Sequence, residues 1–182
     1  ILYEIVNEMP DALCDRVFTP MPDMAQLLRD TNTPLFGLES RRPLGEFDAI
    51  GFSVPYELGA TNVLETLGLG GIPLLAEDRS LDDPVVIGGG ASFVNPEPLA
   101  DFFDCIVIGE GEEILPDILG TLSQFKNRDD GWRLGFLTEV ASWKGVYVPQ
   151  LYAPKYSADY SYQGLAPKRP DIPSTVKRIH VD

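Results

Sequence analysis

Glycines follow two short apolar stretches of this sequence, at positions where an open α/β sheet binds its ligands. Gly88-Gly89-Gly90 follows the apolar residues 85–87, and Gly109-Glu110-Gly111 follows the apolar residues 105–108. Glycine lets the backbone approach a ligand closely and adopt positive φ angles, which a phosphate or a nucleotide tail requires. The same glycines also suit an ordinary tight turn between a strand and a helix, so both interpretations stay open.

Ser53 ends a third apolar stretch, where its hydroxyl suits either a ligand or the turn that follows. No nucleophile constellation accompanies it, because the one histidine, His180, lies close to the end of the sequence. Cys14 and Cys105 are far apart and do not form a zinc or iron–sulfur motif. We therefore predict no catalytic and no metal-ligating residue, and we expect both cysteines to be buried free thiols.

The run from Gly109 to Glu113 only partly matches a dinucleotide-binding fingerprint. It lacks the third glycine, and Glu112 and Glu113 stand where an anionic pyrophosphate would have to lie. These glutamates instead suit the first turn of a helix, where acidic side chains complement the helix dipole. Together with Asp101 and Asp104 they predict a solvated acidic rim.

Strands alternate with helices along the first 125 residues, and the strands are rich in Val, Ile and Phe. This pattern predicts a doubly wound, mainly parallel sheet with helices on both faces. In such a sheet the glycine turns would open onto one shared crevice at the carboxyl edge. The predicted strands cover residues 14–18, 49–54, 85–88 and 105–108, and the predicted helices cover residues 22–30, 61–69, 97–103 and 112–125.

The strand order expected for a flavodoxin-like sheet is 2-1-3-4-5, with the first strand in the centre. Residues 1–7 already have helical spacing, with Leu2, Ile5 and Val6 on one face and no capping residue before them. The first strand is therefore expected upstream of Ile1, and residues 14–18 would be the second strand.

A small C-terminal extension of short elements is expected to follow the main domain. We place the main domain at residues 1–125, an appended helix with short strands at residues 126–165, and a proline-containing linker at residues 166–182. Three tyrosines separated by small polar residues suggest a hairpin or an extended arm. The expected elements are a helix at 132–143, short strands at 145–148 and 151–152, and the arm with Tyr156, Tyr160 and Tyr162.

Composition excludes several classes of protein. The 182 residues carry a net charge of −14, which disfavours direct contact with nucleic acid, although Lys168, Arg169, Lys177 and Arg178 make the last segment locally basic. No apolar run approaches the roughly 18 residues of a membrane span. Without a signal peptide in the sequence, we expect a cytoplasmic location.

Three segments together resemble the N-terminal cobalamin-binding-like domain of B12-binding radical SAM proteins. They are the stretch ending in Ser53, the turn Gly88-Gly89-Gly90 with Asn95-Pro96-Glu97 after it, and residues 104–113 with their Gly-Glu-Gly-Glu run. These features occur in that family in this order and spacing, and the resemblance covers most of residues 1–125. Residues 143–180 resemble the connector that leads to the radical SAM barrel in one branch of the family.

The resemblance implies a flavodoxin-like domain whose crevice holds cobalamin beside an iron–sulfur barrel that cleaves S-adenosylmethionine. Ser53 matches the serine of the family's second motif, and Gly88 and Gly89 match the glycine pair along the nucleotide tail. With Gly90, they are the cofactor-binding residues that we predict. Neither the D-x-H-x-x-G motif of the axial histidine nor the C-x-x-x-C-x-x-C cluster motif occurs here. The [4Fe–4S] cluster and S-adenosylmethionine would therefore belong to the parent protein.

Two functions stay open on the sequence. The chain either positions cobalamin, or acts as a degenerate accessory or regulatory domain, beside a radical SAM domain of the same polypeptide. Alternatively, it is a ligand-free structural module that packs on that domain or on another partner, and a homodimer stays open. A crevice filled by large side chains such as Phe52, Tyr56 or Phe93 would favour the ligand-free module. A nucleotide-binding enzyme is disfavoured by the glutamates.

Overall fold

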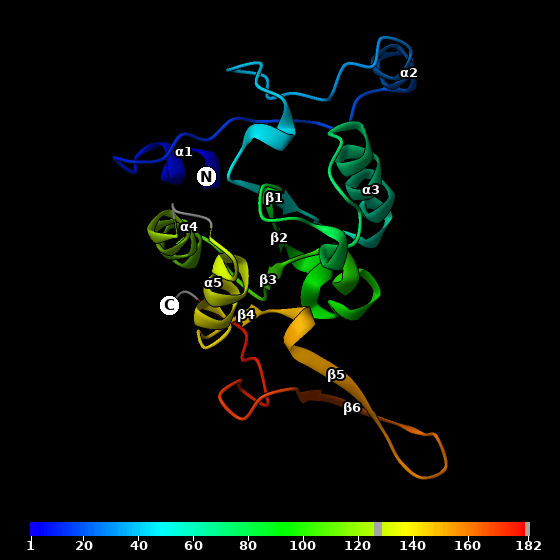
Figure 1. Ribbon diagram of the computed structural model, residues 1–182, viewed down its shortest axis with the longest axis vertical. Coiled ribbons are helices and arrows are strands. Elements are labelled where there is room, and N and C mark those ends of the chain that lie inside the picture. The colour runs from blue at the N-terminus through cyan, green and yellow to red at the C-terminus, as the bar shows by residue number, and fades with distance from the viewer. Residues whose placement is uncertain (126–128, 181–182) are drawn as a thin grey trace.

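The computed structural model describes residues 1–125 and 129–180 and has the predicted mixed α/β architecture (Figure 1). Its centre is a sheet with the order β1-β2-β3-β4, and a separate two-stranded sheet, β5-β6, projects from the C-terminal part. The strands are β1 Ala49–Ser53, β2 Val85–Gly89, β3 Cys105–Val107, β4 Val146–Tyr147, β5 Tyr152–Tyr156 and β6 Tyr162–Pro167.

The first three strands of the central sheet are parallel, as their apolar sequences predict. Ala49 pairs with Val85 and Ser53 with Gly89, while Ile87 pairs with Cys105 on the next strand. β4 closes the β3 side of the sheet in the antiparallel direction. The carboxyl ends of β1, β2 and β3 therefore lie at one edge of the sheet, as the crevice prediction requires.

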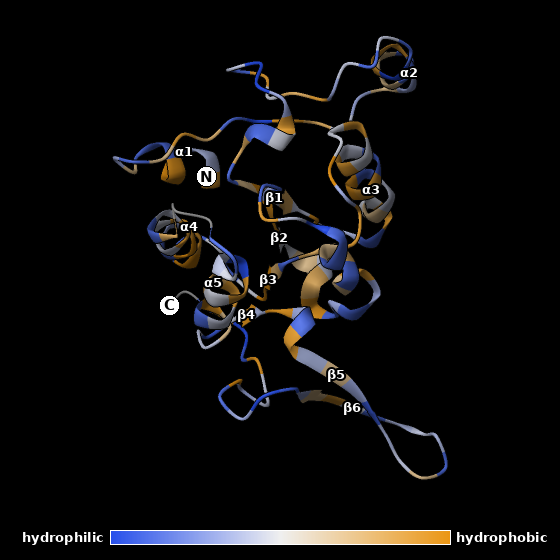
Figure 2. Ribbon diagram, viewed as in Figure 1, coloured by the Kyte–Doolittle hydropathy of each residue, from blue (hydrophilic) through white to orange (hydrophobic). Residues whose placement is uncertain are grey.

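Helices cover both faces of this sheet. Figure 1 shows α3 on one side and α1, α4 and α5 on the other, and Figure 2 shows the strands between them in apolar colours. Pro116 lies in the first turn of α4, where the missing N–H breaks no helical hydrogen bond. The helices are α1 Leu2–Asn7, α2 Pro22–Asp30, α3 Ala60–Leu69, α4 Ile114–Gln124 and α5 Trp132–Val140.

The predicted strand at residues 14–18 is wrong, because this segment is extended but joins no sheet. The Arg16 carbonyl accepts the Leu38 N–H at 2.9 Å, and the Arg16 N–H and guanidinium both bind Glu39 at 2.7 Å. In the order 2-1-3-4-5 the second strand pairs only with the first. Among the described residues no strand lies at the outer edge of β1 to provide that pairing.

Smaller differences reflect local chemistry. The predicted helix at residues 97–103 is a 3-10 helix, Glu97–Phe102, in which Pro98 has no N–H to donate. α4 begins at Ile114, so Glu112 and Glu113 precede the helix and do not lie in its first turn. Of the short strand expected at residues 151–152, Leu151 ends a 3-10 helix and Tyr152 begins the longer β5.

The C-terminal extension contains the predicted hairpin, since β5 and β6 pair antiparallel with Tyr156 opposite Tyr162. Part of the predicted linker packs on the domain. Ile172 is buried, and the Ile179 N–H donates to the Ile108 carbonyl at 2.9 Å. The predicted boundary at residue 126 and the last two residues lie outside the described residues.

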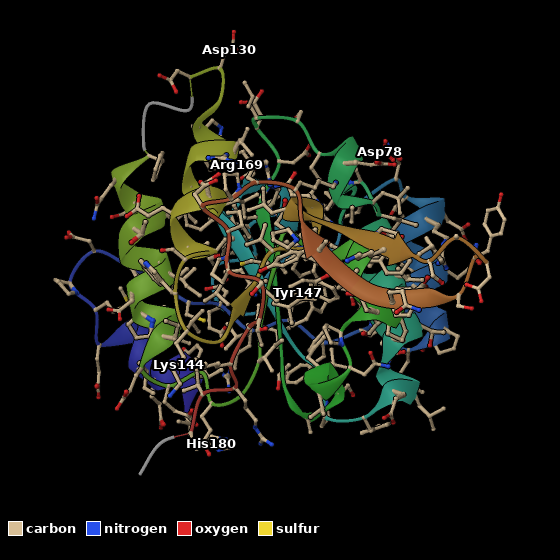
Figure 3. The ribbon with its side chains drawn as sticks, turned by 90° about the horizontal axis from the view of Figure 1, so that it is seen from below. Asp78, Asp130, Lys144, Tyr147, Arg169 and His180 are labelled. Atoms are coloured by element: carbon tan, nitrogen blue, oxygen red, sulfur yellow. The ribbon has the colours of Figure 1, made fainter. Side chains whose placement is uncertain are left out.

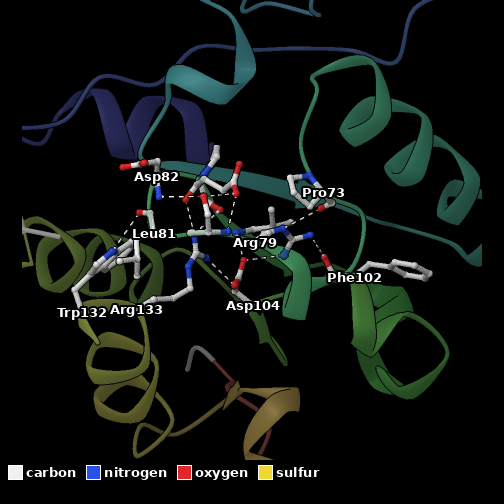
Figure 4. Close-up of polar contacts among 12 residues, drawn as sticks. Pro73, Arg79, Leu81, Asp82, Phe102, Asp104, Trp132 and Arg133 are labelled. Atoms are coloured by element: carbon white, nitrogen blue, oxygen red, sulfur yellow. Dashed lines mark hydrogen bonds and ion pairs between the residues drawn. The ribbon is translucent and has the colours of Figure 1, made fainter. Parts of the chain in front are cut away.

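Asp104 is the buried centre of an ion cluster and does not belong to the solvated rim that we predicted (Figure 4). Its two carboxylate oxygens accept hydrogen bonds from Arg79 Nη1 and Arg133 Nη1, both at 2.8 Å. The Val86 N–H adds a third hydrogen bond at 2.7 Å. The cluster thus joins the beginnings of β2 and β3 to α5, at the sheet edge opposite the glycine turns.

The two arginines of this cluster also donate hydrogen bonds to backbone carbonyls in the segments that precede β2 and β3. Arg79 donates to the carbonyls of Leu74 and Phe102, and Arg133 donates to the carbonyls of Ser80 and Asp83. Burial lowers the pKa of Arg79, and the neighbouring Asp104 carboxylate opposes that shift. Each buried charge has a partner, as stable burial requires.

Cys105 is a buried free thiol, as predicted, whereas the free Cys14 is only half-buried. Burial raises the pKa of the Cys105 thiol. Over residues 1–125 and 129–180, no helix combines the length and the apolar character that crossing a membrane would take.

Candidate ligand crevice at the carboxyl edge of the sheet

The structure brings the four predicted site residues together at the carboxyl edge of the sheet. Ser53 and Gly89 are paired residues at the ends of β1 and β2, and Gly88 pairs with Phe52. The Val54 N–H donates to the Gly89 carbonyl at 2.8 Å, so the pairing continues past the end of β1. Because side chains alternate along a strand, Gly88 faces one side of the sheet while Ser53 and Gly89 face the other.

The side of the sheet that Gly88 faces is filled by aromatic rings. A β-carbon at Gly88 would lie 2.8 Å from Cζ of Phe93 and 3.0 Å from Cδ1 of Phe103. The two phenylalanines are each 1% exposed, and their rings meet edge to face with centroids 5.1 Å apart. Phe52 packs on Phe103 in the same manner. At Gly88, glycine therefore accommodates the protein's own core.

Gly90 is required by the turn itself. Its φ of +111° is in the region that favours glycine, and a β-carbon there would lie 2.7 Å from the Val54 carbonyl oxygen. The Ser92 N–H donates to the same carbonyl at 3.2 Å. Gly90 thus lets the loop after β2 cross the loop after β1.

The opposite side keeps an open strip of small residues, Gly51, Ser53 and Gly89, which we call the small-residue shelf. Nothing lies within 4 Å of a β-carbon placed on Gly51 or Gly89, and Ser53 is exposed. Nearby in the sequence, the buried Oγ of Ser92 has no hydrogen-bond partner among the described residues. The shelf is the part of this edge that a ligand could reach without moving a side chain.

The end of β3 is occupied by the chain's own tail. Gly109 has a φ of +116°, and a β-carbon on it would lie 2.7 Å from the Ile179 nitrogen. Ile179 runs parallel to Gly109 and packs on Gly145, the residue before β4. The glycine at position 109 therefore accommodates the tail, which agrees with the sequence argument against dinucleotide binding.

A cavity of about 180 Å³ lies beneath this tail. The Tyr147 hydroxyl donates to the Glu97 carboxylate at 2.5 Å on its wall. Burial raises the pKa of Tyr147, and Glu97 raises it further, so the phenol keeps its proton. Figure 3 shows Tyr147 near the middle of the lower face, beside the hairpin. The lining is otherwise mainly apolar, with Pro96, Ile108, Tyr152, Leu165, Ser174 and Val176.

Sequence reasoning missed the hydrogen bond between the buried Tyr147 and the exposed Glu97. Glu97 was noted only as part of a family-like segment, and Tyr147 only as part of a short strand. The two residues are 50 positions apart, so no local pattern in the sequence pointed to their contact. Within the described residues, no group of three or more His, Cys, Asp and Glu side chains gathers as a metal site would require.

The parallel strands, the glycine turns at one edge and the covering helices define an open α/β domain. A family model described as the N-terminal domain of radical SAM proteins matches residues 1–149, and the chain belongs to this family. This membership places a radical SAM domain on the same polypeptide. No curated protein and no solved structure matches the chain.

Proposed function

We propose that this chain is an accessory domain of a radical SAM protein, supporting the radical SAM domain without a cofactor of its own. The observation that carries the proposal is the packing of Phe93 and Phe103 against Gly88. A crevice filled by large side chains is the feature that separates the ligand-free module from the cobalamin-binding domain.

The glycine turn does not fit the nucleotide tail of cobalamin. Of the predicted binding residues, Gly88 faces two buried phenylalanines and Gly90 faces the Val54 backbone. A tail on the Gly88 side would have to displace Phe93 from the core, where removing a buried phenylalanine ring costs about 3 to 5 kcal/mol.

Radical chemistry would reside in the radical SAM domain of the polypeptide. The [4Fe–4S] cluster and S-adenosylmethionine would be bound there, since this chain contains two separated cysteines and no cluster motif. The contribution of this domain would be to fix the position and the access of its neighbour, which is the usual role of protein around a reactive cofactor.

A second candidate function rests on the small-residue shelf. The free space above Gly51 and Gly89 and the exposed Ser53 hydroxyl offer a flat surface to which the planar base of a corrinoid tail could bind. In that case Ser53 and Gly89 would carry the binding, and Gly88 and Gly90 would serve the fold alone.

The two candidates are separated by adding hydroxocobalamin to the full-length protein, desalting it, and recording the visible spectrum. The accessory function predicts that no corrinoid bands remain, while reductive cleavage of S-adenosylmethionine is the same with and without hydroxocobalamin. Retention of a stoichiometric corrinoid would overturn it.

A pair of variants shows where a retained corrinoid binds. Ser53→Leu covers the shelf, whereas Ser123→Leu places the same side chain on the exposed surface of α4. If the corrinoid is lost in the first variant and kept in the second, the shelf is the binding site. Loss in both or neither would place it elsewhere.

A further inference from the structure

The β5-β6 hairpin forms an arm that extends away from the rest of the domain (Figure 1). It is a separate sheet of two strands, anchored at its base by the buried Tyr152 and by the half-buried Leu165. A two-stranded hairpin alone in water is marginally stable, because it needs a further strand or a packed face. We call residues 152–167 the tyrosine arm.

The outer half of the tyrosine arm exposes three large aromatic side chains. Tyr156 and Tyr162 are 57% and 55% exposed, and Tyr160, between the strands, is 88% exposed. The rings of Tyr156 and Tyr162 meet across the two strands with centroids 5.9 Å apart. Exposed tyrosines grouped in this way are typical of binding surfaces, where they bury a large area at a low entropic cost.

Tyr160 occupies a backbone conformation that a tyrosine rarely adopts. Its φ is +64°, in the left-handed region that glycine and asparagine favour and bulky residues avoid. The turn is held in this shape by Asp159, whose carboxylate accepts hydrogen bonds from the Ser157 hydroxyl and the Ser161 N–H. The sequence thus gives up local stability to place an aromatic ring at the tip of the arm.

We propose that the tyrosine arm is the surface on which the radical SAM domain of the same polypeptide docks. This inference rests on the proposed accessory function and specifies the contact through which that function is exerted. The arm itself has no net charge, because Lys155 and Asp159 are its two charged residues. Its binding is therefore apolar and aromatic, and it is little affected by salt.

Charge favours this occupant over a second copy of the chain. Residues 152–182 contain five of the 14 Lys and Arg residues and three of the 28 Asp and Glu residues, so residues 1–151 carry a charge of −16. Two such acidic bodies repel one another. A domain on the same polypeptide can dock without bringing two of these acidic bodies together. Its effective concentration is about a millimolar, so even a small aromatic contact is sufficient for docking.

Hydroxyl-radical footprinting of the full-length protein tests the docking directly. Tyr56, in the loop after β1, is 57% exposed and is the internal reference for Tyr156 and Tyr162. Without docking, these three tyrosines would react at similar rates and Tyr160 would react fastest. With docking, Tyr156, Tyr160 and Tyr162 react roughly threefold or more slowly than Tyr56, since residues at the centre of an interface lose most of their exposure. Equal or faster reaction of the arm tyrosines would overturn the proposal.

The variant Tyr160→Asn removes the tip ring while suiting the left-handed backbone better. The hairpin therefore keeps its fold, and loss of docking appears as faster reaction of Tyr156 and Tyr162, up to the rate of Tyr56. The control variant Phe18→Asn removes an exposed aromatic ring away from the arm and keeps the Tyr56 reference, so the protection of all three arm tyrosines should stay unchanged. Unchanged protection in Tyr160→Asn would contradict the role of the tip.

A photo-crosslinking residue in place of Tyr160 identifies the occupant. The proposal predicts crosslinks within one chain, to peptides of the radical SAM domain, at all protein concentrations. Crosslinked dimers that increase with concentration would assign the arm to a second copy and overturn the proposal. These outcomes do not depend on cobalamin. An undocked arm would therefore overturn the docking proposal alone, and a retained corrinoid would overturn the proposed accessory function alone.

Discussion

Gly88 and Phe93 are in direct contact across the face of the sheet, and a methyl group on the glycine would lie 2.8 Å from the ring carbon Cζ. This contact joins the end of β2 to the loop that follows it. It fixes the position of the glycine turn from within the core. Gly88, for which the sequence resemblance implied a ligand role, thus packs against the core in this chain.

Gly88→Ala should destabilise the chain by about 1 to 3 kcal/mol, because the added methyl overpacks the core. Gly89→Ala is the matched control, since nothing lies within 4 Å of its β-carbon, and we expect a change of about 0.5 kcal/mol or less. Urea unfolding of both variants measures the difference. Equal stability of the two variants would show that the Gly88 side has free space.

Asp104→Asn should cost about 3 to 5 kcal/mol of folding free energy, because it leaves two buried guanidinium groups without their counter-charge. Asp101→Asn, three residues earlier and exposed, should change stability by about 0.5 kcal/mol or less. Urea unfolding compares them. If Asp104→Asn is no worse than Asp101→Asn, the cluster does not stabilise the joined strands.

Tyr147 should make the chain less stable at alkaline pH. Its pKa is raised in the folded protein above the value of about 10 expected for the unfolded chain. The resulting stabilisation is complete below pH of about 10 and is lost as the pH rises toward the folded pKa. The unfolding free energy of Tyr147→Phe should therefore fall less between about pH 9 and 11 than that of the wild type. Urea unfolding repeated at intervals of about one pH unit measures both curves.

The same variant should cost about 1 kcal/mol at neutral pH through the lost hydrogen bond to Glu97. Tyr160→Phe is the control, because its hydroxyl is exposed and should leave both quantities unchanged. If Tyr147→Phe lost as much unfolding free energy at alkaline pH as the wild type, other tyrosines would be responsible for the pH dependence. Tyr152 is one of them, because burial also raises its pKa.

Ile179→Ala should loosen the tail from the end of β3. Ile179 packs on Gly145 and donates its N–H to Ile108, so the smaller side chain weakens the apolar part of this contact. Trypsin should then cut faster after Lys177 and Arg178, by about tenfold for each 1.4 kcal/mol of local stability lost. Cleavage after Lys155, in the arm, should not change, and an equal acceleration there would indicate global unfolding instead.

Local sequence patterns predicted the parts of the fold that depend on local chemistry. The bounds of α2 and the positions of β1, β2 and β3 follow from apolar periodicity and from glycine or proline at their ends. The strand prediction for residues 14–18 was wrong because a strand needs a pairing partner. Apolar spacing within a segment does not indicate whether such a partner is present. Pairing is a property of the sheet and not of the segment.

The candidate site shows the same division. Ser53 and Gly89 could be placed at one edge because both end apolar stretches. The filling of the Gly88 side depends on Phe93 and Phe103, which come from the 3-10 helical segments between β2 and β3. Asp104 looked like an ordinary surface carboxylate because its partners, Arg79 and Arg133, are 25 and 29 residues away. Such long-range pairs leave no signal in a single sequence.

The outer edge of β1 has one more consequence. In a parallel ladder alternate residues turn their amides away from the neighbouring strand, so Ala49, Gly51 and Ser53 present theirs beyond β1, where none of the described strands pairs with them. The edge carries no lysine, proline or bulge to deter an incoming chain. An extended segment of another molecule can pair with this edge and lengthen the sheet. Concentrated solutions of the isolated chain should therefore aggregate through the β1 edge.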